Sequence, residues 1–163
     1  RTIILAPIVN PDGYAANSRF NANKIDINRN FQTSNRVNNN RNGLSGFSEP
    51  EAIALAEVIQ KYRPERIVSI HSPLGCVDYD GDAFLLAYRM GKASGLKVKR
   101  LGSRPGSLGS YAGVDIGVPI ITLECTKKDD GLSSEELWGK YGQTLLTAIE
   151  YQPSFRPNIR YAK

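Results

Sequence analysis

Apolar and β-branched residues gather in three short runs, at positions 2–9, 66–71 and 118–125, and a further short strand is predicted at 96–99. Continuous apolar runs of this length are typical of buried β-strands. Four further segments are predicted to be helices: 50–62, 83–94, 107–114 and 133–151. Strands that alternate with helices predict an α/β fold, in which helices flank a β-sheet.

The ends of the predicted helices carry capping residues. Ser48 is placed to cap the first helix, with Pro50 in its first turn and Glu51 completing a capping box. Gly95 ends the second helix, and Ser133 begins the last one. Local signals therefore define the predicted helix boundaries.

Residues 14–48 form a long polar stretch between the first predicted strand and the first predicted helix. The sequence Asn-Pro-Asp-Gly at 10–13 predicts a turn that ends the strand. The tract at 38–43 is rich in asparagine and predicts irregular, mobile backbone. A loop this long in a compact domain is usually functional or disordered, and both alternatives stay open for residues 14–48.

The composition is that of a globular protein and predicts a single domain. The 163 residues are 40% hydrophobic and 23% charged, and no apolar run is long enough to span a bilayer. We expect a domain at 1–151 and an extended tail at 152–163, which contains Pro153 and Pro157.

Charge and cysteine content narrow the possible partners. The net charge is +5, but the basic residues are scattered and no nucleic-acid motif is present, which argues against a nucleic-acid partner. An acidic small substrate, held by a few of the arginines, fits the charge at least as well. Cys76 and Cys125 are too few for a disulfide framework. We expect two buried thiols, and a single disulfide between them stays open as the alternative.

Four polar segments carry side chains suited to catalysis. They are Asn-Pro-Asp-Gly at 10–13, Arg19 with Asp-Ile-Asn-Arg-Asn-Phe at 26–31, Ser-Ile-His-Ser at 69–72 and Thr-Leu-Glu at 122–124. Each segment alone is common, since a turn or a single acid at a strand end needs no function. His71 and Glu124, however, fall at the C-terminal ends of predicted strands, where α/β proteins gather their chemistry.

In order and spacing, these segments resemble the M14 family of zinc carboxypeptidases, over nearly the whole chain. Within that family, the segments at 69–78 and 105–111 are most similar to bacterial murein peptide amidases, which cut the γ-D-glutamyl bond to meso-diaminopimelate in cell-wall peptides. The resemblance implies a zinc carboxypeptidase-like mixed β-sheet flanked by helices. The family's upstream His-x-x-Glu motif is absent here, so we expect the N-terminal part of the domain to be missing or supplied by a second polypeptide.

The resemblance also implies roles for particular residues. His71 corresponds to the third ligand of one zinc ion, whose other two ligands belong to the upstream motif. Glu124 corresponds to the general base and acid, and Arg19 to the group that stabilises the oxyanion. Asn28 and Arg29 correspond to the pair that holds the terminal carboxylate of the substrate.

Three other residues lie near these positions. Tyr111 lies in the region of a family tyrosine that covers the substrate, but at an unmatched spacing, and we assign it to the pocket wall. Asp78 and Asp80 follow the strand that ends at His71, and we expect them to line the pocket or face solvent. Metal ligation and recognition of a substrate ammonium group are their alternative roles.

The predicted function is zinc-dependent hydrolysis of an amide bond near the C-terminus of murein peptides, at the γ-D-Glu–diaminopimelate linkage. The alternatives are an N-acyl amino acid deacylase and a non-catalytic carboxylate-binding module. Because a binding pocket needs no carboxylate at the scissile bond, Glu124 argues against the second alternative. The same resemblance implies a cytoplasmic location, with the periplasm as the alternative.

Overall fold

One four-stranded mixed β-sheet organises the computed structural model, which describes residues 2–153 and 159–161. The strands are β1 (Ile67–His71), β2 (Leu74–Asp80), β3 (Lys97–Lys99) and β4 (Ile120–Thr126), in the order β1-β4-β2-β3. Strand β4 is parallel to β1 and antiparallel to β2, and β3 is parallel to β2. The predicted α/β class and mixed sheet are therefore confirmed.

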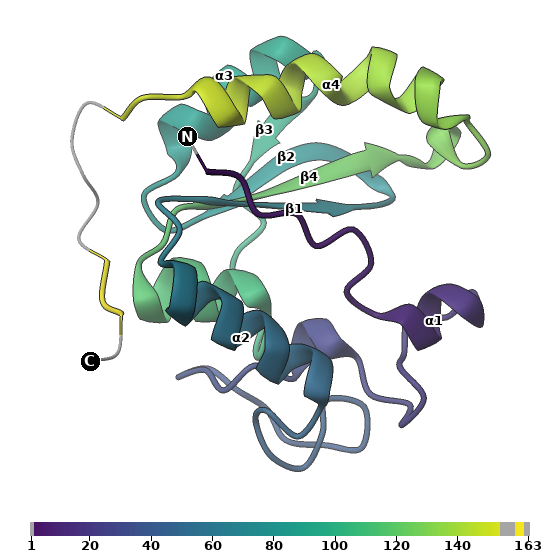
Figure 1. Cartoon of the computed structure of the whole chain (residues 1–163), viewed down its shortest axis with the longest axis vertical. Coiled ribbons are helices and arrows are strands. Elements are labelled where there is room, and N and C mark those ends of the chain that lie inside the picture. Colours follow the sequence, from purple (N-terminus) through teal and green to yellow (C-terminus); the bar gives the residue numbers. More distant parts are fainter. Residues whose placement is uncertain (1, 154–158, 162–163) are drawn as a thin grey trace.

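Helices cover both faces of the sheet (Figure 1). Helices α3 (Phe84–Ser94) and α4 (Ser134–Glu150) lie on one face, and α2 (Pro50–Tyr62) lies on the other with the π-helix η2 (Gly109–Ile116). Three short helices complete the described elements: α1 (Pro11–Ala15), η1 (Ile27–Arg29) and η3 (Lys127–Asp129). Each face of the sheet packs against its own apolar core.

The two faces of the sheet differ in polarity. On the face toward α3 and α4, Val77, Ile121 and Leu123 are fully buried. Side chains directly opposite each other on paired strands share a face, so the register gathers polar groups on the other face. That polar face carries Ser69, His71, Cys76, Asp78, Asp80, Thr122 and Glu124.

Residues 2–9 form no strand, which makes that prediction wrong. The segment is exposed, and Leu5 is 83% accessible. A strand needs a neighbour for its backbone hydrogen bonds, and no described segment pairs with residues 2–9. Nor does Asn10 start a simple turn: its Oδ1 accepts the N–H of Gly13 at 2.9 Å and caps α1.

The helix boundaries follow the prediction with one correction. Helix α2 begins at Pro50, but its N-cap is Glu49, and the capping box predicted for Ser48 and Glu51 does not form. Instead the Ser48 hydroxyl donates to Glu49 Oε1, and Glu49 is buried. The capping box of α4, between Ser133 and Glu136, is present.

Strand β2 is an element that the sequence did not predict. It reads Leu-Gly-Cys-Val-Asp-Tyr-Asp, with an acid at two of its seven positions. Acidic residues and glycine are depleted in strands, so no local pattern favours a strand here. Pairing with β4 on one side and β3 on the other supplies the missing stabilisation.

The polar segment 14–48 is irregular, as predicted, and its shape is held by side chains bonded to the backbone. Asn30, which is fully buried, donates to the carbonyl of Asn42 and to Ser48 Oγ, both at 2.8 Å, and accepts the N–H of Glu49 at 3.0 Å. The guanidinium of Arg36 donates to five carbonyl groups, those of Arg29, Phe31, Asn42, Gly43 and Ser45. These bonds replace a strand ladder, because buried backbone groups must be paired.

Both cysteines are free thiols, Cys76 buried and Cys125 partly so. Cys76 lies opposite Glu124 in the register, so Cys125, the next residue along, points to the other face of the sheet. The disulfide that the sequence left open is therefore not formed.

Part of the C-terminal tail contacts the body of the protein. The hydroxyl of Tyr161 donates to the carbonyl of Pro64 at 2.5 Å, and the N–H of Arg160 donates to the carbonyl of Ile116 at 2.7 Å. Positions 154–158 and 162–163 of the predicted tail lie outside the described residues, and the division at 151 stays a prediction.

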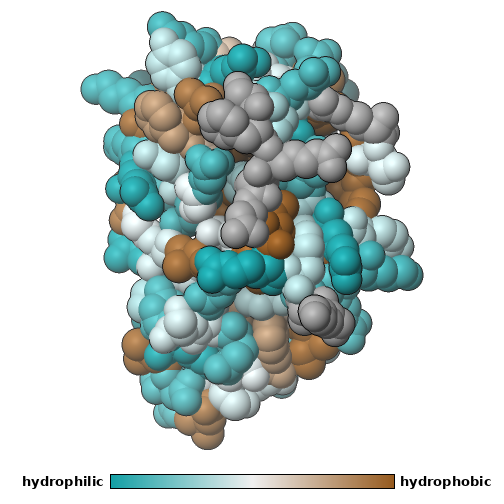
Figure 2. All heavy atoms as spheres, turned by 90° about the vertical axis from the view of Figure 1, so that its left-hand side faces the viewer, coloured by the Kyte–Doolittle hydropathy of each residue, from teal (hydrophilic) through white to brown (hydrophobic). Residues whose placement is uncertain are grey.

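None of the described helices is both long and apolar enough to cross a membrane. On the side of the molecule shown in Figure 2, hydrophobic residues form separate patches among hydrophilic ones.

A buried carboxylate links η3 to α4 and makes stability depend on pH. Asp129 accepts hydrogen bonds from Lys140, from the Tyr141 hydroxyl at 2.6 Å and from the N–H of Thr126 at 2.7 Å. These donors, led by Lys140, hold the pKa of Asp129 well below its usual range. A depressed carboxyl pKa stabilises the fold above the unfolded pKa of about 3.9, and this stabilisation is lost as the pH falls further.

We therefore expect Asp129→Asn to lower the Tm at pH 7, with the difference from the wild type narrowing as the pH falls below about 4. Circular dichroism melting at a series of pH values measures this. The exposed neighbour Asp130 provides the control, Asp130→Asn, which should shift the Tm little. A difference that stays constant down to acid pH would contradict the assignment.

Candidate active site

The sheet brings His71 and Glu124 together from 53 positions apart in the sequence. They are register partners at the C-terminal ends of the parallel strands β1 and β4, so they lie side by side on the polar face. Glu124 is only 8% exposed, and its Oε2 accepts the N–H of Leu74 at 3.4 Å. The Nε2 of His71 lies 3.0 Å from Ser69 Oγ.

The surroundings of His71 favour its neutral form. Burial lowers the pKa of the imidazole, and the nearby negative charge of Glu124 opposes that shift only in part. The imidazole is therefore neutral near pH 7, and neutral imidazole is the form that ligates metals. Arg19, Arg29 and Asp26 also act on the pKa of His71, which places these charges within electrostatic reach of the strand ends.

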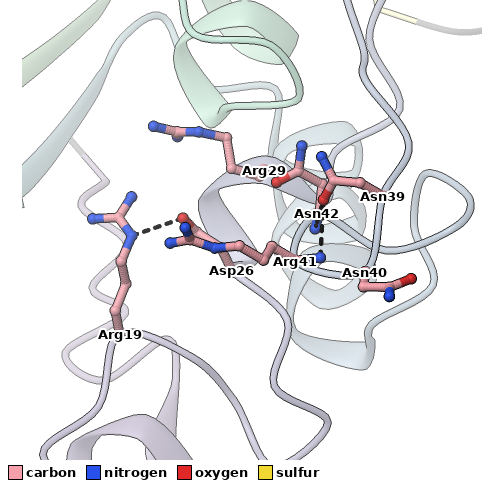
Figure 3. Close-up of a pocket in the computed structure, with 7 residues that line it drawn as sticks. All are labelled: Arg19, Asp26, Arg29, Asn39, Asn40, Arg41 and Asn42. Carbon is pink, nitrogen blue, oxygen red and sulfur yellow. Dashed lines mark hydrogen bonds and ion pairs between the residues drawn. The ribbon is translucent and has the colours of Figure 1, made fainter.

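An open cavity of about 850 Å³ collects the predicted arginines; we call it the arginine cavity. Its lining is Arg19, Asp26, Arg29, Asn39, Asn40, Arg41 and Asn42, drawn in Figure 3. The Nε of Arg19 donates to Asp26 Oδ2 at 2.7 Å. The N–H of Asn28 donates to Asp26 Oδ1 at 3.1 Å, so Asp26 both caps η1 and orients Arg19.

Asn28 and Arg29 are set by the same short helix. The Oδ1 of Asn28 accepts the N–H of Leu108 at 2.8 Å, which ties this side chain to the loop before η2. The Arg29 guanidinium donates to the carbonyl of Asn28. Burial lowers the pKa of Arg29, and the positive charge of Arg19 adds to the shift while Asp26 opposes it. A guanidinium nevertheless stays protonated near neutral pH, so Arg29 is a partly desolvated cation.

Tyr111 lies in the apolar core and does not line the arginine cavity. Its ring stacks on Phe31 at 5.5 Å and meets Phe47 edge-on at 5.5 Å. Its hydroxyl accepts a hydrogen bond from Gln60 Nε2 at 3.2 Å. This position anchors η2 and gives no support to the predicted role of Tyr111 in the pocket wall.

Asp78 and Asp80 do not face solvent, which corrects one of the expectations. Both are buried on the polar face that carries Glu124. Asp78 Oδ1 accepts the N–H of Leu101 at 2.8 Å, and Asp80 accepts the hydroxyl of Ser103. Burial raises the pKa of Asp78. Both acids are thus held by local donors.

The described residues do not complete a zinc site. A catalytic zinc ion takes three protein ligands. Within the described residues, no three His, Cys, Asp or Glu side chains lie close enough together to hold a metal ion. Of the three ligands that such an ion needs, His71 could supply one.

For two residues of this site, the sequence alone predicts no role. Asp26 stands in the Asp-Ile-Asn-Arg-Asn-Phe segment, where the sequence alone assigns it no role, although aspartate is a preferred helix N-cap and Asp26 caps η1. Arg41 lies in the asparagine-rich tract, where no periodicity points to a function. The bond from the Asp26 N–H to the Arg41 carbonyl, at 2.8 Å, brings that tract to the site.

The fold and the site define a member of a peptidase family. The family model described as zinc carboxypeptidase, Peptidase M14, matches residues 1–82, and the chain belongs to this family. Murein peptide amidase A of Escherichia coli (strain K12) is 32% identical over 92% of this chain and 68% of its own length. Murein peptide amidase A of Vibrio campbellii (strain ATCC BAA-1116) is 28% identical over 89% of this chain and 63% of its own length.

Solved structures agree with membership of this family. Murein-tripeptide amidase MpaA from Escherichia coli O157 superposes with a TM-score of 0.74 at 29% identity, covering 90% of this chain and 67% of that one. Carboxypeptidase A from Helicoverpa armigera shares the fold, with a TM-score of 0.72 at 18% identity over 88% of this chain and 49% of that one. The chain thus spans about two thirds of the length of the amidases, and these similarities give no support to a second polypeptide.

Proposed function

We propose that the protein is a hydrolase that cleaves an amide bond in murein peptides, at the γ-D-Glu–meso-diaminopimelate linkage. The observation that carries this proposal is the pairing of the buried Glu124 carboxylate with His71 at two adjacent strand ends. The arginine cavity supplies cations within electrostatic reach of that pair. The names of the amidase relatives support the class of substrate.

The chemistry needs a proton acceptor, a stabilised carbonyl oxygen and a held substrate. Glu124 takes a proton from the attacking water and returns it to the leaving amine. Arg19 stabilises negative charge on the carbonyl oxygen, and Asp26 fixes the Arg19 guanidinium for this task. Arg29, with Asn28 beside it, binds the terminal carboxylate, because a guanidinium forms paired hydrogen bonds with that group.

Zinc enters the proposal as the cofactor of the family, with His71 as one ligand. Bound zinc lowers the pKa of a water molecule and polarises a carbonyl group. The roles proposed for Glu124, Arg19 and Arg29 are argued from where these residues lie and do not depend on the position of zinc.

Incubation with a peptide that contains the γ-D-Glu–meso-diaminopimelate bond, in the presence of zinc, tests the proposal. We expect mass spectrometry to detect free meso-diaminopimelate, and we expect a chelator to stop its release and added zinc to restore it. Binding of the peptide without cleavage would instead favour the non-catalytic carboxylate-binding module. Cleavage of N-acyl amino acids with the peptide left intact would favour the deacylase.

A further inference from the structure

The arginine cavity holds more positive charge than its own residues neutralise. Three arginines, Arg19, Arg29 and Arg41, line it with a single acid, Asp26, so its formal charge is +2. Both carboxylate oxygens of Asp26 already accept a hydrogen bond, Oδ2 from Arg19 and Oδ1 from the N–H of Asn28. Among the described residues, Arg19–Asp26 is the only ion pair in this cavity. Arg29 and Arg41 therefore keep two positive charges available to a ligand.

Arg41 is held in place, unlike a typical arginine on a surface loop. Its carbonyl accepts the N–H of Asp26 at 2.8 Å, and its own N–H donates to Asn39 Oδ1 at 2.9 Å. Its guanidinium stacks over the ring of Phe20, with 5.1 Å between the guanidinium carbon and the ring centre. Fixing a side chain before the ligand arrives lowers the entropy cost of binding, so Arg41 is prepared for a ligand.

The three arginines also lie near one another. Figure 3 shows the guanidinium groups of Arg19 and Arg41 beside the Asp26 carboxylate, with the side chain of Arg29 above them. The positive charges of Arg19 and Arg41 contribute to lowering the pKa of Arg29, so these cations repel one another in the free protein. An anionic ligand relieves that repulsion, and a dianion relieves it more than a monoanion does.

We propose that Arg41 is a second carboxylate-binding residue, so that the cavity selects ligands with two carboxylates, one held by Arg29 and one by Arg41. This inference rests on the proposed function and specifies the substrate further. Meso-diaminopimelate carries two carboxylates, and lysine has the same structure with one of these carboxylates replaced by hydrogen. Arg41 then discriminates peptides that end in diaminopimelate from peptides that end in lysine.

Isothermal titration calorimetry of the whole chain with meso-diaminopimelate and with L-lysine tests this inference. We expect the wild type to bind diaminopimelate at least about tenfold more tightly, since a hydrogen bond between charged groups is typically of that strength. Arg41→Gln should weaken diaminopimelate about tenfold and leave lysine unchanged. Arg29→Gln should weaken both ligands.

A charge-matched control comes from Arg100, which is exposed, stacks on Tyr79 and does not line the cavity. Arg100→Gln removes the same charge and should change neither affinity. If Arg41→Gln has a lower Tm than the wild type, Arg41→Lys serves as a second variant. It keeps the charge but loses the paired hydrogen bonds, so its preference for diaminopimelate over lysine should lie between those of the wild type and Arg41→Gln.

The inference is overturned if the wild type binds the two ligands equally or binds neither, or if Arg41→Gln weakens both by the same factor. A different result would contradict the proposed function: the protein would bind diaminopimelate more tightly than lysine but would not cleave the diaminopimelate peptide. Conversely, equal cleavage of diaminopimelate and lysine peptides by the wild type would overturn the role of Arg41 and leave the hydrolase intact.

Discussion

Glu124→Gln is expected to reduce kcat on a murein peptide by a factor of about 100 to 10,000, the usual contribution of a general acid or base. The amide of glutamine has nearly the same shape as the carboxylate, and its oxygen can still accept the N–H of Leu74. It cannot take a proton from water. The affinity for meso-diaminopimelate should therefore stay close to that of the wild type, because the ligand charges are met by the arginine cavity.

Measuring kcat, KM and ligand affinity on the same preparation separates chemistry from folding. Glu135→Gln, in the first turn of α4 and exposed, makes the same chemical change away from the site and should leave all three values unaltered. A Glu124→Gln variant that melts like the wild type and retains most of its kcat would remove Glu124 from the reaction. A variant that loses affinity and kcat together would assign Glu124 to binding.

The predictable part of this fold is the part whose signals are local. Strands β1 and β4 and helices α3 and α4 lie within a few residues of their predicted bounds, because each has an apolar run or a capping residue of its own. The pairing of His71 with Glu124 follows from strands ending at the same edge of a parallel pair. The positions of His71 and Glu124 at strand ends could therefore be predicted from the sequence, whereas their catalytic and metal-binding roles stay predictions.

The parts that were missed depend on partners far away in the chain. Residues 2–9 have the composition of a strand, but composition cannot supply a neighbouring strand. Strand β2 has the opposite problem, since its acids argue against a strand and only its place between β4 and β3 makes it one. Asp26 and Arg41 meet through a single backbone bond that no pattern in residues 14–48 reveals.

The long polar segment gains its rigidity from one aromatic side chain as well as from hydrogen bonds. Phe31 is 1% exposed and packs against Phe47 and Tyr111, so it joins the segment to α2 and η2. Its N–H donates to the carbonyl of Gly106 at 3.0 Å. Phe31 also follows η1, the helix that carries Asn28 and Arg29. Core packing and the carboxylate site are thus coupled here.

Phe31→Ala should consequently lower the free energy of unfolding by about 3–5 kcal/mol, the range for removing a buried aromatic ring. Because most small domains are only about 5–15 kcal/mol stable, this is the largest stability loss expected from a single change in the segment. Urea unfolding followed by circular dichroism measures it. Leu44→Ala, at a position 75% exposed in the same segment, is the control and should cost less than about 0.5 kcal/mol.

The same variant tests whether the core positions the site. If Phe31 orders η1, Phe31→Ala should weaken diaminopimelate binding under conditions where the variant is still fully folded, and Leu44→Ala should not. Loss of stability with unchanged affinity would mean that the hydrogen bonds of Asn30 and Arg36 hold Arg29 without the aromatic core. A stability loss below about 1 kcal/mol would contradict the burial of Phe31 in the core. Removing a fully packed phenyl ring leaves a cavity, and the surrounding residues cannot fill that cavity without a cost in free energy.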